Sequence, residues 1–184
     1  MTRRPRRHGS TRHERGAAAV EFALVAPLLF VILFGIIDYG IWFSDSISAR
    51  QAVRDGARRG SVEQFGSCGG GSDLANLACT VKSGMGQISG TTYVRVVIAP
   101  DPASASSNVG TPAGTPAWKV GATLRVCAIT EHNSLLPFVP FPAGGFAKTR
   151  VDIPVEVAGA GATTRVGYAG DPLPGGVDWP SWCQ

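Results

Sequence analysis

The chain lacks the residue patterns on which most enzymes depend. Two of its three histidines, His8 and His13, lie within the first 16 residues, so His132 is the only histidine in the rest. There is no G-x-S-x-G elbow, no G-x-G-x-x-G fingerprint and no H-E-x-x-H zinc helix. Glu131 and His132 are adjacent and lack the spacing of a metal motif. A single histidine does not exclude a Ser–His–Asp arrangement. We nevertheless expect that the protein is not an enzyme and has no cofactor and no metal site.

The chain after residue 16 also lacks an excess of basic side chains. The formal net charge is +4, but residues 1–16 hold six arginines and one glutamate, so the remaining chain holds 11 basic and 12 acidic side chains. With a net charge of −1, this part of the chain has no basic bias of the kind that marks a nucleic-acid binder, and we expect no nucleic-acid partner. The basic leader, residues 1–16, therefore indicates membrane topology instead.

Charge is nearly absent from Ala17 to Ile37, where Glu21 is the single charged residue. As a helix this stretch would be roughly 31 Å long, at about 1.5 Å per residue, which is enough to cross a bilayer once. An ionisable residue at the bilayer centre costs on the order of 3 kcal/mol, so a glutamate near the start of such a run points to a function.

The flanks predict the orientation of this helix. Arginines precede the span, and the first charges after it are Asp38 and Asp45. The positive-inside rule therefore places the N-terminus in the cytoplasm and the rest of the chain outside. Tyr39, Trp42 and Phe43 stand where an aromatic belt would mark the outer face. We expect a single-pass protein of the cytoplasmic (inner) membrane.

Two simpler interpretations compete with a specialised span. A cleaved secretory signal also has a basic start and an apolar core, but this apolar run is longer and no small-x-small cleavage site follows it closely. An uncleaved plain anchor fits the hydropathy as well.

The stretch RGAAAVEFALVAPLLFVILFGIIDYG, followed by SARQAVRDGARRG, resembles the N-terminus of TadE-like proteins. These are minor pseudopilins of tight-adherence (Flp-type) pilus systems, related to type IV pilins. The resemblance covers residues 12 to about 60. It implies a type III signal in residues 1–16, cut by a prepilin peptidase after Gly16 to leave Ala17 as the first residue. It also implies that Glu21 and Phe22 make assembly contacts with other pilins, pseudopilins and pilus assembly proteins.

Glu21 has a physical role in this interpretation. In filaments of the pilin type the glutamate pairs with the new N-terminal amine of a neighbour, which compensates a charge buried among apolar helices. The alternative is that Glu21 lies at the cytoplasmic interface and is solvated.

Beyond the transmembrane segment, residues 17–40, we expect an amphipathic helical stalk over residues 41–60. Ile47, Val53 and Ala57 recur at helical spacing, and Gly60 is a plausible stop. Residues 61–184 are expected to form an extracytoplasmic, β-rich domain with Pro- and Gly-rich loops. The strands are predicted at Thr92–Ala99, Ala122–Thr130 and Thr149–Val157. One face of the first strand should pack against the stalk. The predicted fold class is α+β, with a pilin-like helix followed by a small antiparallel sheet.

Four cysteines outside the cytoplasm, Cys68, Cys79, Cys127 and Cys183, suggest two disulfides. The favoured pairing is Cys68 with Cys79 and Cys127 with Cys183, although four cysteines allow three pairings. The Gly-rich stretch between the first two is expected to be a turn.

An apolar, Pro-rich loop runs from Asn133 to Phe146. If it is exposed, its large side chains form a contact patch for a partner or for the membrane surface; if it is tucked down, they only close the core. These side chains are Leu135, Leu136, Phe138, Val139 and Phe141.

The predicted function is that of a minor pseudopilin in assembly of a tight-adherence pilus, and on assembly the protein would become part of that pilus. The alternative is an uncleaved, single-pass, membrane-anchored extracellular binding module.

Overall fold

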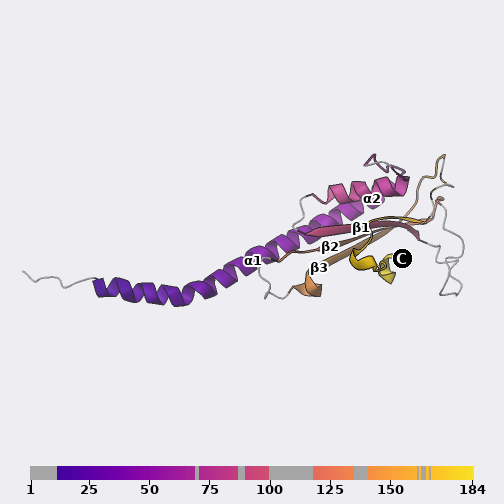
Figure 1. Cartoon of the computed structure of the whole chain (residues 1–184). Coiled ribbons are helices and arrows are strands. Elements are labelled where there is room, and N and C mark those ends of the chain that lie inside the picture. Colours follow the sequence, from indigo (N-terminus) through magenta and orange to yellow (C-terminus); the bar gives the residue numbers. More distant parts are fainter. Residues whose placement is uncertain are drawn as a thin grey trace, which may run out of the picture.

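The computed structural model describes residues 12–68, 71–86, 90–99, 118–134, 141–160, 162, 165 and 167–184. Helix α1 (Arg12–Ser61) is 50 residues long and projects from one end of the folded domain (Figure 1). It is followed by α2 (Asp73–Gly84), β1 (Thr91–Ala99), β2 (Thr123–Glu131), β3 (Phe146–Pro154) and β4 (Tyr168–Gly170). The predicted fold class, α+β with a long apolar helix and a small antiparallel sheet, is confirmed.

The four described strands form one antiparallel sheet in the order β3-β2-β1-β4. The three strands expected from β-branched, partly alternating runs are present, with ends shifted by up to three residues. The short strand β4, which pairs with the middle of β1, was not predicted.

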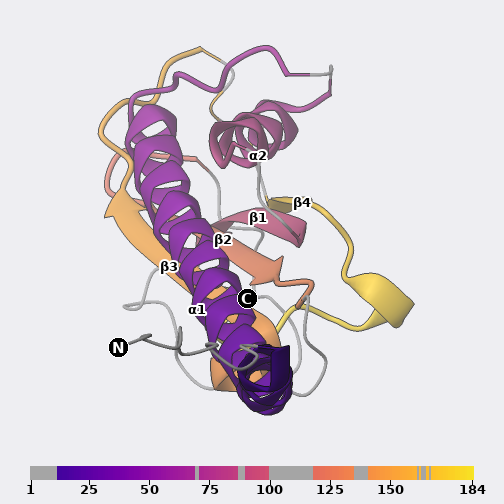
Figure 2. The ribbon, with the colours of Figure 1, turned by 90° about the vertical axis from the view of Figure 1, so that its left-hand side faces the viewer.

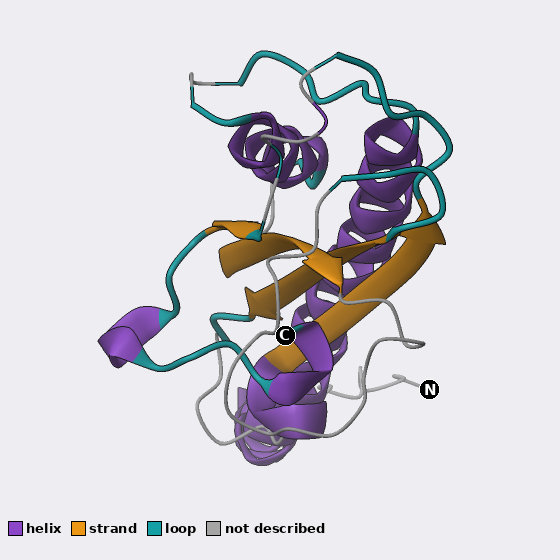
Figure 3. Ribbon diagram, turned by 90° about the vertical axis from the view of Figure 1, so that its right-hand side faces the viewer, coloured by secondary structure: helices purple, strands orange, loops and turns teal. Residues whose placement is uncertain are grey.

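Both helices cover the same face of the sheet, with α1 lying over β2 and β3 and α2 over β1 and β4 (Figures 2 and 3). Val53 and Ala57 of α1 are fully buried there, in one core cluster with Val94 and Val96 of β1. This face of β1 was expected to pack against the stalk. It is buried as expected, but the helix directly above β1 is α2.

Helix α2 corrects the prediction that Gly66–Cys79 is only a turn. Ser72 is its N-cap and accepts a hydrogen bond from the backbone N–H of Ala75 at 3.3 Å. Leu74, Leu77 and Val81 are buried on one face. A capping serine followed by apolar residues at i, i+3 and i+7 is a helix pattern that the neighbouring glycines obscured.

The opposite face of the sheet carries the C-terminal segment. Cys183 is bonded to Cys127 of β2, and Trp179 is buried against this pair, so the aromatic side chain packs down beside the disulfide. Cys68 and Cys79 form the second disulfide, which ties the loop after α1 to α2. The structure thus holds the pairing that the sequence favoured.

Residues 100–117, between β1 and β2, lie outside the described residues. The first described residue after them is Trp118. It is fully buried, packs edge-on against Phe65 and donates its indole N–H to the carbonyl oxygen of Val157 at 3.0 Å.

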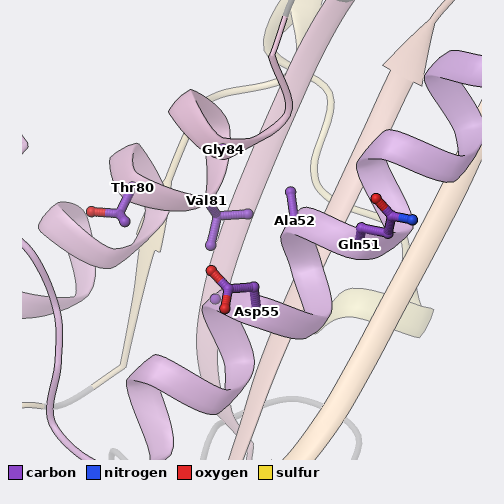
Figure 4. Close-up of a pocket in the computed structure, with 7 residues that line it drawn as sticks. Gln51, Ala52, Asp55, Thr80, Val81 and Gly84 are labelled. Atoms are coloured by element: carbon purple, nitrogen blue, oxygen red, sulfur yellow. The ribbon is translucent and has the colours of Figure 1, made fainter.

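Helices α1 and α2 approach closely at Gly56, beside a shallow hollow of about 170 Å³ (Figure 4). A Cβ atom at Gly56 would lie 2.1 Å from Cγ2 of Val81. A β-branched side chain cannot swing away easily, so α2 would have to shift.

We expect Gly56→Ala to destabilise the domain by about 1–3 kcal/mol, because overpacking outweighs the gain in helix propensity. Thermal unfolding of the full chain in detergent micelles, followed by near-UV circular dichroism, measures this loss. Gly40→Ala is the matched control, since nothing lies within 4 Å of its Cβ position. Equal melting temperatures for the two variants would contradict the close approach of α1 and α2.

Candidate assembly site and its junction with the domain

The N-terminal half of α1 has no packing partner among the described residues. Leu24 is 76% exposed and Ile36 is 67% exposed. The helix is long and apolar enough to cross a membrane, and none of its most apolar stretch is buried. An apolar surface this large is covered by lipid or by other helices. Pro27 lies within it without ending the helix.

The predicted processing and assembly residues all lie on this unpartnered half. Gly16, Ala17, Glu21 and Phe22 are exposed and helical. Ala17 and Glu21 are four residues apart, so they lie on one face of α1. A Cβ atom at Gly16 would meet nothing within 4 Å, although glycine costs about 1 kcal/mol relative to alanine in a helix. Packing among the described residues therefore gives no reason for a glycine at position 16.

A buried polar cluster joins α1 to the domain immediately after Ile37. The side chain of Asp38 is fully buried; its Oδ1 lies 2.9 Å from Nε2 of His132, and its Oδ2 accepts a hydrogen bond from the hydroxyl of Ser134 at 2.7 Å. Both partners belong to the segment at the end of β2, about 95 residues away in sequence. We call these three residues the junction cluster.

Aromatic rings cover the junction cluster. Phe141 stacks on Tyr39 with ring centroids 5.3 Å apart, lies 6.5 Å from Trp42 and 5.0 Å from His132. Tyr39 and Trp42, for which the sequence predicted an aromatic belt, contact Phe141 of the domain, while Phe43 is 60% exposed.

The predicted partner patch is only partly within the described structure. Phe141 is half-buried against α1 and so makes an intramolecular contact. The other four patch residues lie outside the described residues: Leu135, Leu136, Phe138 and Val139.

The junction cluster contains an aspartate, a histidine and a serine, but not in the arrangement of a hydrolase triad. In a triad the serine hydroxyl donates to the imidazole, which acts as its base. Here the single hydroxyl proton of Ser134 goes to the carboxylate, and His132 contacts the same carboxylate. The geometry is that of a buried, hydrogen-bonded carboxylate that fixes the position of α1.

The sequence did not predict the junction cluster. In the sequence Asp38 is a charge that flanks the span, and His132 is an isolated histidine. No local spacing connects them, because their proximity depends on how α1 crosses β2 and β3.

These features define a class of protein: an α+β domain whose core includes the C-terminal half of a helix long enough to anchor it in a membrane. Residues 16–58 match the family model for TadE-like protein. The match covers the apolar half of α1 and most of its packed half. The resemblance seen in the sequence is confirmed over these residues. The match connects the protein in general terms with Tad pilus function. Comparisons with curated proteins and with solved structures gave no match.

We expect His132→Ala to destabilise the domain by about 2–3 kcal/mol, because it removes one hydrogen-bond partner of the buried carboxylate of Asp38. Denaturant unfolding of the full chain in micelles measures this loss. The double variant Asp38→Ala/His132→Ala should lose less than the sum of the two single variants.

The control is Asp55→Ala, which removes an exposed i,i+4 ion pair with Arg59 and should cost less than about 1 kcal/mol. If His132→Ala cost no more than Asp55→Ala, the junction cluster would not hold α1 in place.

Proposed function

We propose that this protein is a minor pseudopilin that takes part in assembly of a tight-adherence (Flp/type IV-like) pilus. The observation that carries the proposal is a TadE-like helix whose first half is apolar, unpartnered and marked by one carboxylate, while its second half is the core of a folded domain. Such a subunit presents a helix to its neighbours and keeps its domain outside the helix bundle. The proposed role is structural, without catalysis or a cofactor.

Processing by a prepilin peptidase after Gly16 is part of this proposal. Gly16 packs against nothing in the part of the chain that the structure describes, which favours a role in recognition by the enzyme. Cleavage there removes the basic leader and keeps the entire apolar run, so the mature protein remains anchored. It also creates a cationic amine on Ala17, on the same helix face as Glu21.

Glu21 is proposed as the charge that selects the register of assembly. Its side chain is exposed, and no residue of the described chain forms an ion pair with it. Among apolar helices an unpaired carboxylate is costly, so an amine from a neighbouring subunit is the natural partner. Phe22, equally exposed, would contact the same neighbour.

The proposed domain organisation is a leader (1–16), a transmembrane segment (17–40), a stalk (41–60) and an extracytoplasmic domain (61–184), with the N-terminus in the cytoplasm. The structure adds a detail to these boundaries. Residues 41–60 include Ala49, Val53 and Ala57 of the domain core, so the stalk is packed on the sheet and is not free. Asp38 is tied to His132, so the domain starts close to the end of the apolar run.

An uncleaved, single-pass, membrane-anchored binding module remains the alternative function. It would keep residues 1–16 and would not need Glu21. Two variants of α1 distinguish the proposals.

Gly16→Ala should abolish or strongly slow removal of the leader, because the peptidase recognises the glycine. The intact mass of the membrane-bound protein, from cells that contain the peptidase, reports the cleavage. Gly35→Ala is the matched control: it makes the same substitution in the same helix, also at a position where a Cβ meets nothing within 4 Å. A full-length wild-type protein, or normal cleavage of Gly16→Ala, would contradict processing at this site.

Glu21→Ala should still insert into the membrane but should co-purify with other pilus components at least 100-fold less. An uncompensated charge costs about 3 kcal/mol or more, and 1.4 kcal/mol corresponds to a factor of ten. Leu24→Ala, on the next turn of the same face, controls for loss of side-chain volume without loss of charge. Equal recovery of the Glu21 variant and the wild type would rule out charge pairing as the basis of assembly.

A further inference from the structure

The sheet face opposite the helices holds an arginine, Arg95, that forms no ion pair with any other described residue. The guanidinium of Arg95, in the middle of β1, lies 4.0 Å from the ring centroid of Tyr168 and 6.0 Å from that of Trp179. Its Nε atom is buried without a hydrogen-bond partner. Within the described chain the guanidinium forms no hydrogen bond and no ion pair.

Other arginines on this face are paired. Arg125 and Arg150 both bind the carboxylate of Asp152. Arg95 is the exception. Burial lowers the pKa of Arg95 from its ordinary value, although electrostatic interaction with Tyr168 and Asp178 acts in the opposite direction. A guanidinium remains charged in proteins even so.

Arg95 lines a hollow of about 280 Å³ formed by β4 and the segment after it. The walls include the rings of Tyr168 and Trp179 and the apolar side chains of Leu173 and Val177. Tyr168 and Val177 are each about two-thirds exposed, so the hollow opens to the surface. A cationic group beside apolar walls is complementary to an anion that carries an apolar group.

Two carboxylates also line the hollow, and they differ in availability. Oδ2 of Asp171 is occupied, at 3.0 Å from Nζ of Lys82 and 3.0 Å from the backbone N of Val94. Asp178 is exposed and acts on Arg95 only through its charge. These two negative charges disfavour a dianion such as phosphate more than a monoanion.

We propose that this hollow binds a carboxylate carried by an apolar segment of a partner polypeptide. The Arg95 guanidinium lies over the ring of Tyr168, and its planar N–H fork matches a carboxylate in a bidentate pair. The site is preorganised, because Arg95 gives up no existing partner when the ligand binds. It lies on the face opposite α1, so it stays open when α1 packs with other helices, and it does not depend on the proposed processing or on Glu21.

The test is a titration of the full chain in micelles, followed by the NMR signals of the Arg95 Nε–H and the Trp179 indole N–H. The probe is N-acetylphenylalanine, and the matched control is N-acetylphenylalaninamide, which has the same apolar group without the carboxylate. We expect saturable binding of the acid, at least tenfold tighter than of the amide. Acetate, which lacks the apolar group, and inorganic phosphate should both bind more weakly than the acid.

Three variants separate this site from a merely structural stacking of Arg95. Arg95→Gln should abolish the response of the Trp179 signal, and Arg95→Lys should weaken binding at least threefold, since an ammonium lacks the planar fork. Asp178→Asn should tighten binding, because it removes a competing charge. An intact Cys127–Cys183 disulfide and an unchanged near-UV circular dichroism spectrum verify that each variant folds. If Arg95→Gln does not fold, Arg95→Lys and Asp178→Asn still test the proposal.

Equal affinities for acid and amide would overturn the proposal, as would tighter binding of phosphate or unchanged binding by the Arg95 variants. If acetate bound as tightly as N-acetylphenylalanine, the hollow would be a site for small free carboxylates. That result would overturn the proposal that it binds a segment of a partner polypeptide.

Discussion

One continuous helix constrains everything else in this protein, because α1 has to satisfy two environments at once. Its first half exposes a long apolar surface that carries Glu21, and its second half buries Ala49, Val53 and Ala57 against the sheet. The two halves cannot move independently without breaking backbone hydrogen bonds of the helix. Any packing of the apolar half, with lipid or with other helices, therefore also determines where the domain sits.

The junction cluster holds the domain rigidly on α1 directly after the apolar run. Asp38 is the first charged residue after the apolar run, and burial of its carboxylate would be costly without His132 and Ser134. Their hydrogen bonds favour one rotation of α1 relative to the sheet, and the aromatic contacts of Phe141 add to it. In an assembly, the register chosen by the helix would therefore pass directly to the domain, which would carry surfaces such as the Arg95 hollow to defined positions.

The features that the sequence predicts are those with a local physical cause. The apolar run, the α+β class and three of the strands follow from hydropathy and periodicity, and the TadE-like resemblance follows from the pattern around Glu21. Helix α2 was missed because glycines beside Cys68 suggested a turn, although Ser72 and the spacing of Leu74 and Leu77 were sufficient to indicate it. The junction cluster and the Arg95 hollow join residues far apart in sequence. Their proximity depends on the crossing of α1 over the sheet and on the pairing of β4 with β1, which no local pattern specifies.

The central claim is that α1 anchors a disulfide-bonded domain on the outer side of the membrane. It is tested most directly by labelling intact spheroplasts with a membrane-impermeant amine reagent and locating the label by mass spectrometry. All three lysines of the chain, Lys82, Lys119 and Lys148, follow the apolar run and are exposed on the domain. We expect all three to react without permeabilisation. Labelling only after the membrane is permeabilised would place the domain in the cytoplasm, which would contradict both the proposed orientation and the proposed role in a pilus.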